Sequence, residues 1–476
     1  MKKNTTSDSR RKFIKNSITA GAVFSIVPRS VLGGSGFVAP SDTLYIAGIG
    51  VGGKGKSDLS SFAEHKQVKI AYLCDVDDNR AADAVKAYSK AKYFKDYRVM
   101  LEKVGGEIDA VSVSTPDHNH AVQTMAAMQL GKHVYVQKPL THDIYEARML
   151  TEASNKYKVV TQMGNQGASG DGVRLMREWY ESDQIGQVEE IFVWTNRPVW
   201  PQGIPWPSSK SDIPAHLNWD LWLGTAPYKE YVDKLVPFNW RGWWDYGTGA
   251  LGDMGCHLIE PAFSVLQLGY PDAVQASVGS VYVDEFQRGY FPDSCPPSSH
   301  VIFDFTVNAK KIKMHWMDGG IQPMRPDELG PNEVMGDGGN GVIIKGTKGS
   351  MMCGTYGANP QLIPTTKTKE VSVEQKYNRV PEGHYLQWVD ACLAGYGKKE
   401  CSSDFKIAGP LTECILMGNL AIRSHDIRKK VKNDRFEYPG RDIKLIWDGD
   451  NMKVTNFEEA NEFVRRTYRD GWSLGA

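Results

Sequence analysis

The chain has 476 residues, of which 41% are hydrophobic and 24% are charged, as in a soluble globular protein of two or three domains. Lys and Arg together number 56, as do Asp and Glu, so the formal net charge is zero. These values exclude a disordered chain and a polytopic membrane protein, and they argue against nucleic acid as a partner. The seven cysteines form no CxxC pair, so neither a zinc ribbon nor a dense disulfide framework is indicated.

Residues 1–40 are predicted to be an export signal and linker. Arg10 and Arg11 precede a Phe-Ile-Lys sequence and an apolar stretch at 17–28 that is too short to span a bilayer. The twin arginine resembles a Tat signal, and a basic helix start is the alternative interpretation. No cysteine lies near the end of the apolar stretch, so no lipid anchor is expected. We therefore predict a periplasmic protein without a membrane anchor.

A strand-to-helix turn with the spacing Gly-x-Gly-x-x-Gly comes next. Thr43–Gly50 is predicted to be a strand, and Gly48, Gly50 and Gly53 lead into a helix that ends near Glu64. The first glycine permits a tight turn, the second lets the backbone approach a pyrophosphate, and the third lets helix and strand pack closely. The phosphates would lie at the helix N-terminus. A turn without a ligand is the alternative.

The next predicted strand, Val68–Cys74, ends at Asp75. Asp75 lies 22 residues beyond Gly53, near the spacing expected for a carboxylate that binds the ribose 2′-hydroxyl of NAD. A carboxylate there repels the 2′-phosphate of NADP, so NAD is the predicted cofactor, with NADP kept as the alternative by Arg80. Because an exported enzyme cannot draw on the cytoplasmic nicotinamide pool, we expect the dinucleotide to be held tightly.

Strands continue to alternate with helices up to residue 166. The predicted strands are 110–114, 133–137 and 159–163, and the predicted helices are one ending near 130 and one at 144–157. This alternation predicts an α/β Rossmann domain at 41–166 with a doubly wound parallel sheet, which binds ligands at the carboxyl ends of its strands. The predicted cofactor-binding residues at these ends are Gly48, Gly50, Gly53, Asp75, Thr115, Pro116, His118, Gln137, Lys138 and Asn165.

Lys138 and two histidines in this domain allow more than one interpretation. Lys138 precedes Pro139, which restricts it to extended conformations. It is either a surface turn residue or a cleft lysine whose ammonium donates to a substrate oxygen. His118 and His120 suggest helix-start or cofactor contacts. No nearby spacing of Cys, His or Asp completes a metal site, so no metal is predicted.

Residues 167–476 are predicted to form a second domain, of α+β class. Eight of the thirteen tryptophans lie between Trp194 and Trp244. Indole faces suit sugar rings, but we interpret most of these residues as a compact loop core, with one or two lining the site. Strands near 188–195, 273–283, 301–306, 311–317 and 341–345 indicate an open, mostly antiparallel sheet, with helices at 251–266, 383–393 and 410–423 and a long loop at 319–341.

Asp253 and His257 are four residues apart on one face of the predicted helix 251–266. The carboxylate can orient or charge-stabilise the imidazole, which can act as a base near neutral pH. A surface Asp–His pair is the alternative. Arg241 is assigned to the cofactor site. Tyr246 is assigned to the substrate site, together with Lys138, Asp253 and His257.

Five motifs together resemble the Gfo/Idh/MocA oxidoreductases, which are named for glucose–fructose oxidoreductase and inositol dehydrogenase. The similarity runs from about Thr43 to at least Arg423. It implies a Rossmann domain, a C-terminal domain with an open sheet, a tightly bound nicotinamide dinucleotide and a sugar-like substrate. The motifs are GIGVGG at Gly48–Gly53, CDVD at Cys74–Asp77, TPDHNH at Thr115–His120, QKP at Gln137–Pro139 and GDMGCH at Gly252–His257.

The resemblance assigns roles to three residues and shows two departures. Lys138 falls at the lysine of the family's EKP motif, and Asp253 and His257 fall at its Asp-x-x-x-His pair. Gln137 replaces the usual Glu, which removes a negative charge beside the nicotinamide. Asp117 replaces the usual Asn after Thr-Pro.

Three functions fit these residues. The first is a sugar or glycoside dehydrogenase in which His257 takes the proton of a secondary hydroxyl, Lys138 bonds the reacting oxygen, and Asp253 holds His257 or a neighbouring hydroxyl. The second is an NAD-dependent, redox-neutral glycosidase, similar to a Tat-exported α-N-acetylgalactosaminidase branch that has a histidine where this chain has Gly249. The third is a non-catalytic sugar-binding module. A homodimer or homotetramer is expected because open sheets of this kind commonly pair.

Overall fold

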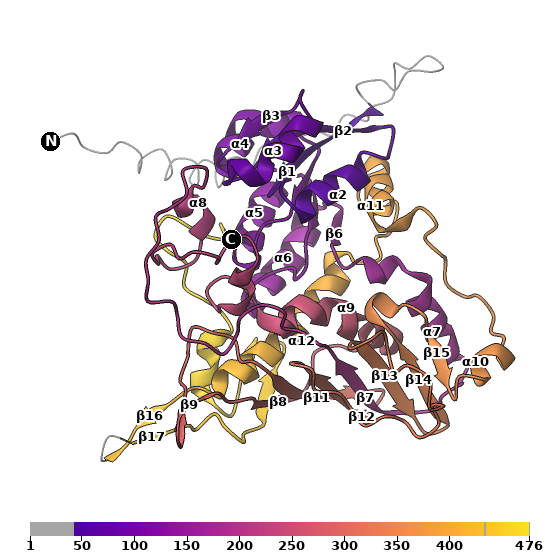
Figure 1. The fold of residues 1–476 in the computed structure, drawn as a ribbon. Helices are drawn as coiled ribbons and strands as arrows, with labels where there is room; N and C mark the ends of the chain where they lie inside the picture. The colour runs from indigo at the N-terminus through magenta and orange to yellow at the C-terminus, as the bar shows by residue number, and fades with distance from the viewer. Residues whose placement is uncertain (1–41, 433–434, 476) are drawn as a thin grey trace.

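The computed structural model describes residues 42–432 and 435–475, so the predicted export signal lies outside the described residues. Figure 1 shows an upper lobe, formed mainly by the N-terminal part of the chain, above a second lobe built on a broad sheet. The upper lobe contains a six-stranded sheet in the order β3-β2-β1-β4-β5-β6, and all its neighbouring strands are parallel. This order confirms the predicted doubly wound Rossmann sheet.

The helices of the Rossmann lobe begin where the sequence provides capping groups. Asp77, Asp96 and Asp143 each accept hydrogen bonds from backbone N–H groups at the start of a helix. The strands are β1 Leu44–Ile49, β2 Val68–Cys74, β3 Lys92–Phe94, β4 Ala110–Val113, β5 His133–Val136 and β6 Thr161–Met163. The helices are α2 Lys54–Phe62, α3 Asp78–Ala87, α4 Tyr97–Val104, α5 Asp117–Gln129 and α6 Ile144–Tyr157.

The second lobe is built on a nine-stranded sheet in the order β15-β14-β13-β7-β12-β11-β8-β18-β19. Only the β7–β12 pair in this sheet is parallel, so the predicted mostly antiparallel sheet is confirmed. Its strands are β7 Val188–Trp194, β8 Ala273–Val278, β11 Ser299–Val307, β12 Lys310–Met317, β13 Gly341–Gly346, β14 Gly349–Cys353, β15 Gln361–Ile363, β18 Leu445–Asp448 and β19 Lys453–Val454.

The remaining elements are helices and two small hairpins. The hairpins pair β9 Tyr282–Asp284 with β10 Gln287–Arg288, and β16 Lys429–Lys430 with β17 Phe436–Glu437. The helices are α7 Asp171–Glu181, α8 Trp219–Leu223, α9 Gly249–Leu266, α10 Lys367–Glu370, α11 Gly383–Ala394 and α12 Phe405–Ser424.

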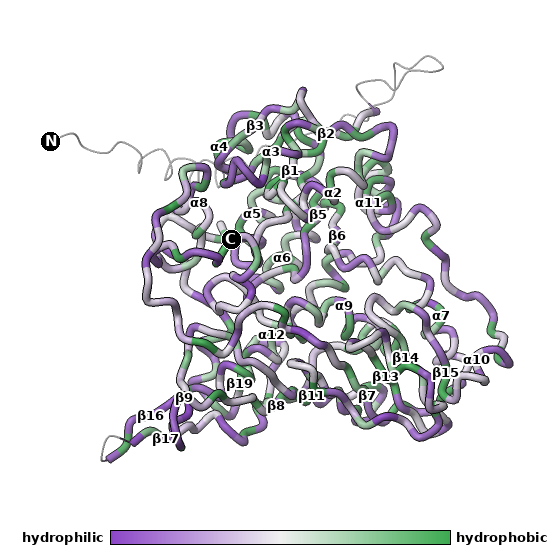
Figure 2. The backbone as a smooth tube through the Cα atoms, in the orientation of Figure 1, coloured by the Kyte–Doolittle hydropathy of each residue, from purple (hydrophilic) through white to green (hydrophobic). Residues whose placement is uncertain are grey.

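Two apolar helices, α9 and α12, join the lobes. They pack against each other, and α12 also packs against α6 of the upper lobe and β8 of the lower sheet. Among the described residues, α12 is the one helix long and apolar enough to cross a membrane, and 83% of its most apolar stretch is buried inside the fold. Figure 2 shows apolar residues on the strands of the lower sheet as well, such as β13 and β14. The lobes therefore share one continuous core.

The tryptophan-rich region forms a small core of its own beside the Rossmann lobe. Trp219, Trp222, Trp240 and Trp243 pack together with Tyr246, and Trp219 stacks on Trp222 with ring centroids 4.8 Å apart. This arrangement agrees with the predicted loop core. Only part of the cluster borders the cleft described below. That part of the cluster positions the site.

Candidate active site

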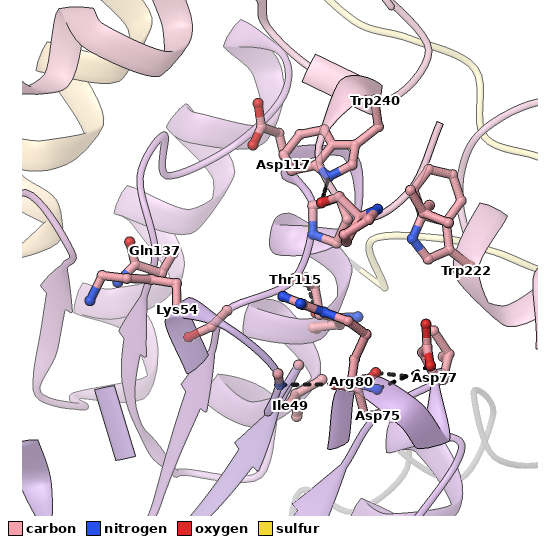
Figure 3. A pocket seen from close by; sticks show the side chains of 18 of the residues that line it. Ile49, Lys54, Asp75, Asp77, Arg80, Thr115, Asp117, Gln137, Trp222 and Trp240 are labelled. Atoms are coloured by element: carbon pink, nitrogen blue, oxygen red, sulfur yellow. Dashed lines mark hydrogen bonds between the residues drawn. The ribbon is translucent and has the colours of Figure 1, made fainter. Parts of the chain in front are cut away.

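A cavity of about 440 Å³ lies at the carboxyl ends of the Rossmann strands, where the fold predicts a ligand. Figure 3 shows Lys54 and Gln137 on one side of it and Asp77 and Trp222 on the other. Nine of the predicted site residues line this cavity, and they come from both lobes. They are Gly50, Asp75, Thr115, Pro116, Gln137, Lys138, Arg241, Asp253 and His257.

The glycine-rich turn lines the cavity through Gly50 and Gly52, and parts of it have no space for a side chain. Gly50 has a φ of 75°, and a Cβ there would lie 2.7 Å from the carbonyl oxygen of Ser114. The close contact between helix and strand is made by Gly55, where a Cβ would lie 1.8 Å from the Gly50 carbonyl oxygen. The packing role that we predicted for Gly53 therefore belongs to Gly55. Gly53 precedes α2, and a Cβ there would lie 2.3 Å from the Arg80 guanidinium.

Asp75 lies beside this turn, next to Arg80 (Figure 3). Its carboxylate accepts hydrogen bonds from the backbone N–H groups of Val51, at 2.8 Å, and Gly52, at 3.2 Å. Burial raises the pKa of this carboxyl, and the backbone donors partly offset the rise. An open glycine turn with a carboxylate at the end of the next strand fits a dinucleotide, because the turn can approach phosphates and the carboxylate can accept from a ribose hydroxyl.

Lys138 and Asp253 form an ion pair between the lobes. The Lys138 Nζ donates to the Asp253 Oδ1 at 2.7 Å and to the Asp253 carbonyl oxygen at 2.8 Å. The Arg241 Nε lies 3.4 Å from the same Oδ1. Burial acts to raise the pKa of Asp253, but the charges of Lys138 and Arg241 outweigh it and the net pKa is lowered. An ammonium has three N–H donors, so Lys138 keeps one for a ligand.

His257 lines the same cavity but is not held by Asp253 as predicted. Its side chain is buried, and its Nδ1 has no hydrogen-bond partner among the described residues. The Tyr356 ring meets it edge-on, with centroids 4.5 Å apart. Burial and then the charge of Lys138 lower the pKa of His257 to about 3, against a partial opposing effect of Asp253. The imidazole is therefore neutral at neutral pH and keeps one ring nitrogen as a hydrogen-bond acceptor.

A buried carboxylate on α2, Asp58, contacts two residues that line the cavity, Gln137 and Lys54, and was not predicted from the sequence. It accepts hydrogen bonds from Gln137 Nε2 at 2.8 Å, Ser114 Oγ at 2.9 Å and Tyr385 Oη at 3.1 Å. Lys54 also pairs with it. Asp58 therefore places a carboxylate behind Gln137, where it is paired with Lys54. The signal in the sequence is an aspartate on the face of α2 that carries Leu59 and Phe62 into the core.

Replacing Asp58 with Asn tests whether this charge is needed. We expect Asp58→Asn to lower the free energy of unfolding by about 1–3 kcal/mol, because four donors lose a charged acceptor in a buried site. Chemical denaturation measures this loss. Asp83→Asn is the matched control, since Asp83 pairs with Lys56 at the surface and we expect no measurable change there. Equal effects of the two variants would contradict a special role for Asp58.

Three further predicted residues do not reach the cavity. His118 is fully buried. Its ring lies 3.0 Å from the carbonyl oxygen of Trp222 and 3.2 Å from that of Tyr246, so it links α5 to the tryptophan cluster. Tyr246 is itself buried in that cluster. Asn165 is buried beside Ser403, which donates to its Oδ1. The predicted cofactor contacts of His118 and Asn165 and the predicted substrate contact of Tyr246 are therefore not seen.

The other predicted histidine, His120, also has a structural role. Its ring nitrogens each lie 2.7 Å from a backbone carbonyl oxygen, one of Thr115 and one of Pro139, so it links two turns at the cleft. Gly48 packs against Val51 and Leu59, and neither Gly48 nor Gly53 lines the cavity. Within 42–432 and 435–475, no group of three or more His, Cys, Asp or Glu side chains is placed to hold a metal ion.

Comparison with known proteins agrees with the fold and the turn chemistry. Residues 44–165 match the model of the Gfo/Idh/MocA oxidoreductase family, NAD-binding Rossmann fold, and residues 197–287 match the model of that family's C-terminal α/β domain. These matches confirm the predicted family for the two segments that they cover. The solved structure of levoglucosan dehydrogenase in complex with NADH and levoglucosan shares the fold, with a TM-score of 0.54 and 17% identity over 83% of this chain and all of that one.

Two curated relatives represent two kinds of activity. D-Glucoside 3-dehydrogenase of Escherichia coli is 26% identical over 256 residues, which are 54% of this chain and 61% of the relative. Alpha-N-acetylgalactosaminidase of Shewanella oneidensis is 29% identical over 171 residues, which are 31% of this chain and 37% of the relative. The alignments with the first relatives span about two fifths to three fifths of their lengths.

Proposed function

We propose that this protein is an NAD-dependent oxidoreductase that oxidises a secondary hydroxyl of a sugar or glycoside. The observation that carries the proposal is the meeting of Lys138, Asp253 and His257 in one cavity with the glycine turn and Asp75. The dehydrogenases among the relatives support it. The predicted export and the predicted homodimer or homotetramer stay predictions.

The residues have separable roles in this reaction. NAD, when bound, accepts hydride from the carbon that bears the hydroxyl. The remaining N–H of Lys138 donates to the reacting oxygen and stabilises its developing negative charge. The neutral His257 accepts the hydroxyl proton. Asp253 and Arg241 hold the Lys138 ammonium in place, and the Gln137–Asp58 pair fixes the adjoining wall of the cleft.

We assign Tyr356 to the part of the cavity that receives the substrate. This residue was not predicted from the sequence. It lines the main cavity and also a second cavity of about 340 Å³ formed by the loops at 166–172 and 356–360. A group attached to the reacting sugar can extend past Tyr356 into this space, which supports a glycoside as substrate. Its φ of 66° is a strained value for tyrosine, and strain of this kind clusters at functional sites.

Tyr356→Gly separates binding from stability. Glycine adopts a φ of 66° without strain, so we expect the free energy of unfolding to stay unchanged or to rise. The KM for a glycoside should rise by about tenfold, since aromatic contact with the sugar is lost. Thermal unfolding measures the first effect, and single-turnover reduction over a range of glycoside concentrations measures the second. An unchanged KM would show that Tyr356 does not contact the substrate.

The redox-neutral glycosidase remains the second candidate because of the relatives of that class. One position in the structure argues against the glycosidase. Gly249 has a φ of 64°, and a Cβ there would lie 3.1 Å from the Cys295 Sγ, so the backbone does not suit the histidine found in that branch. The non-catalytic module is disfavoured because Lys138 and His257 converge in one cavity.

The proposal is tested on protein purified without added cofactor. Denaturation should release one dinucleotide per chain, identified as NAD by chromatography. Adding sugars or glycosides to the intact protein should then produce reduced nicotinamide in a single turnover. A protein that neither contains nor binds a dinucleotide would overturn the proposal.

A further inference from the structure

The end of the chain returns to the Rossmann lobe and closes one side of the cleft. Residues 465–475, the C-terminal segment, follow the 3₁₀ helix Glu458–Phe463. Figure 1 shows the chain end in front of the upper lobe, near α8. Within this segment, Gly475 accepts a hydrogen bond from Gln129 at the end of α5, and Leu474 is buried in the main core. The segment is therefore an ordered part of the lobe that carries the glycine turn.

Buried ionic contacts anchor the first part of the segment. Arg466 donates to Glu146 Oε1 at 2.7 Å, and its backbone N–H donates to Asp143 Oδ2 at 3.1 Å. Tyr468 Oη donates to the same Glu146 oxygen at 2.6 Å. Glu146 has no exposed surface and Asp143 is buried. Both carboxylates belong to the start of α6, just after the turn that carries Lys138, so the segment is fixed directly to the cleft.

A second set of contacts fixes the segment to α8. The Arg469 guanidinium donates to the Asp220 Oδ1 and to the Asp220 carbonyl oxygen, both at 2.7 Å. Its Nε donates to the Gly224 carbonyl oxygen at 3.1 Å. The next residues of α8, Leu221 and Trp222, line the cavity. The segment therefore holds one wall of the cavity as well as contributing to it.

Trp472 is the residue of the segment that lines the cavity. The Arg98 guanidinium lies 4.3 Å from the centre of its ring and is held by Asp96, and the Tyr97 ring lies 6.4 Å away between centroids. These three residues begin α4, directly after β3. The indole is therefore set at the β3 end of the cleft by a cation–π contact with Arg98, which Asp96 holds by hydrogen bonds.

The sheet order tells which part of a dinucleotide this end receives. Lys138 follows β5 and Trp472 lies beside the end of β3, with β2, β1 and β4 between them. Neighbouring strands lie about 4.8 Å apart, so the two side chains border ends of the cleft that are roughly 20 Å apart. With phosphates at the β1 turn and the adenosine ribose at Asp75 after β2, the next strand end, at β3, meets the adenine.

We propose that the C-terminal segment supplies the adenine wall of the cleft through Trp472 and slows release of the dinucleotide. This inference rests on the cofactor of the proposed function. It assigns Trp472 as a purine-stacking residue, with Arg466 and Arg469 as the positioning residues that hold the segment in place. Because Arg98 holds the indole and Arg466 and Arg469 hold the segment that carries it, the base can leave only by losing its contact with Trp472.

Trp472→Ala tests the stacking contact, with Trp472→Phe as the conservative variant and Phe436→Ala, an exposed aromatic of the β16–β17 hairpin, as the control. The readout is the amount of NAD retained through gel filtration and its dissociation rate, measured by exchange with a fluorescent adenine-modified NAD. Trp472→Ala should release NAD roughly tenfold faster or more, as expected for loss of aromatic stacking on a base. Trp472→Phe should recover most of the retention, and Phe436→Ala should not change it.

Fragments of the cofactor locate the effect and separate this inference from the proposed function. AMP binding should weaken in Trp472→Ala by the same factor as NAD binding, whereas binding of nicotinamide mononucleotide should not change. If the wild-type protein binds NAD and the variant retains it equally, with unchanged AMP binding, this inference is overturned and the proposed function stands. If the wild-type protein binds neither NAD nor AMP, both are overturned. The melting temperature of each variant checks that it folds.

Discussion

Lys138→Met is expected to lower kcat/KM for sugar oxidation by about 10²–10³, because a preorganised donor at a developing oxyanion contributes that much. Methionine preserves most of the length of the side chain and removes only the charge and the donors. Asp253 keeps Arg241 as a neighbouring cation, so the fold should survive. The loss should appear mainly in kcat, since the interaction strengthens as charge develops on the oxygen. The rate of single-turnover reduction of the bound nicotinamide, followed over a range of concentrations of one sugar, measures it.

The control for Lys138 is Lys210→Met, which removes an exposed lysine that pairs with exposed Glu230. That variant should keep the wild-type kcat/KM. Both variants should retain bound NAD. If Lys138→Met kept kcat and changed only the melting temperature, Lys138 would be a structural link between the lobes and the proposed oxyanion role would be wrong.

His257→Asn is expected to lower kcat by about 10²–10⁴, the range that general-base catalysis contributes. The pH dependence tests the same residue without a substitution. Burial and the charge of Lys138 lower the pKa of His257 to about 3, from an ordinary value of 6.5. The group is therefore already neutral well below pH 6.5, and kcat/KM should stay flat with respect to it down to about pH 5.

The pKa of His257 also depends on the charge of Lys138. Lys138 is a main cause of the low pKa, so Lys138→Met should raise the pKa of His257 and move the acid limb of the profile to higher pH. His300→Asn, on the partly exposed face of β11, should leave the profile unchanged. If the wild-type kcat/KM profile had an acid limb near pH 6.5 that disappeared in His257→Asn, the imidazole would be solvated, and burial would not lower its pKa.

The elements best predicted from sequence are those with strong local signals. The predicted helix 144–157 coincides with α6, because Asp143 and Glu146 form a capping box that marks its start. The strand 68–74 also coincides with β2, since it is a buried run that ends at a polar residue. By contrast, the pattern does not indicate β3, which has only three residues, none of them fully buried.

Site residues that directly follow a strand were predicted from the sequence. Site residues whose positions depend on contacts with distant segments were missed. Lys138 and Asp75 lie at strand ends, so the topology alone brings them to the cleft. Asp58 is placed by donors from three other segments, and Trp472 by a segment that lies more than 300 residues along the chain from β5. His118 is at a strand end too, but the tryptophan cluster covers it. Local spacing cannot show such covering.

The most direct test of the central claim follows reduced nicotinamide and aglycone release together, in one sample of the purified protein with aryl glycosides. We expect reduced nicotinamide to form in proportion to protein with no release of aglycone, and we expect His257→Asn to lower the rate of its formation by about 10²–10⁴. Steady aglycone release without net reduced nicotinamide would contradict it and would establish the redox-neutral glycosidase instead.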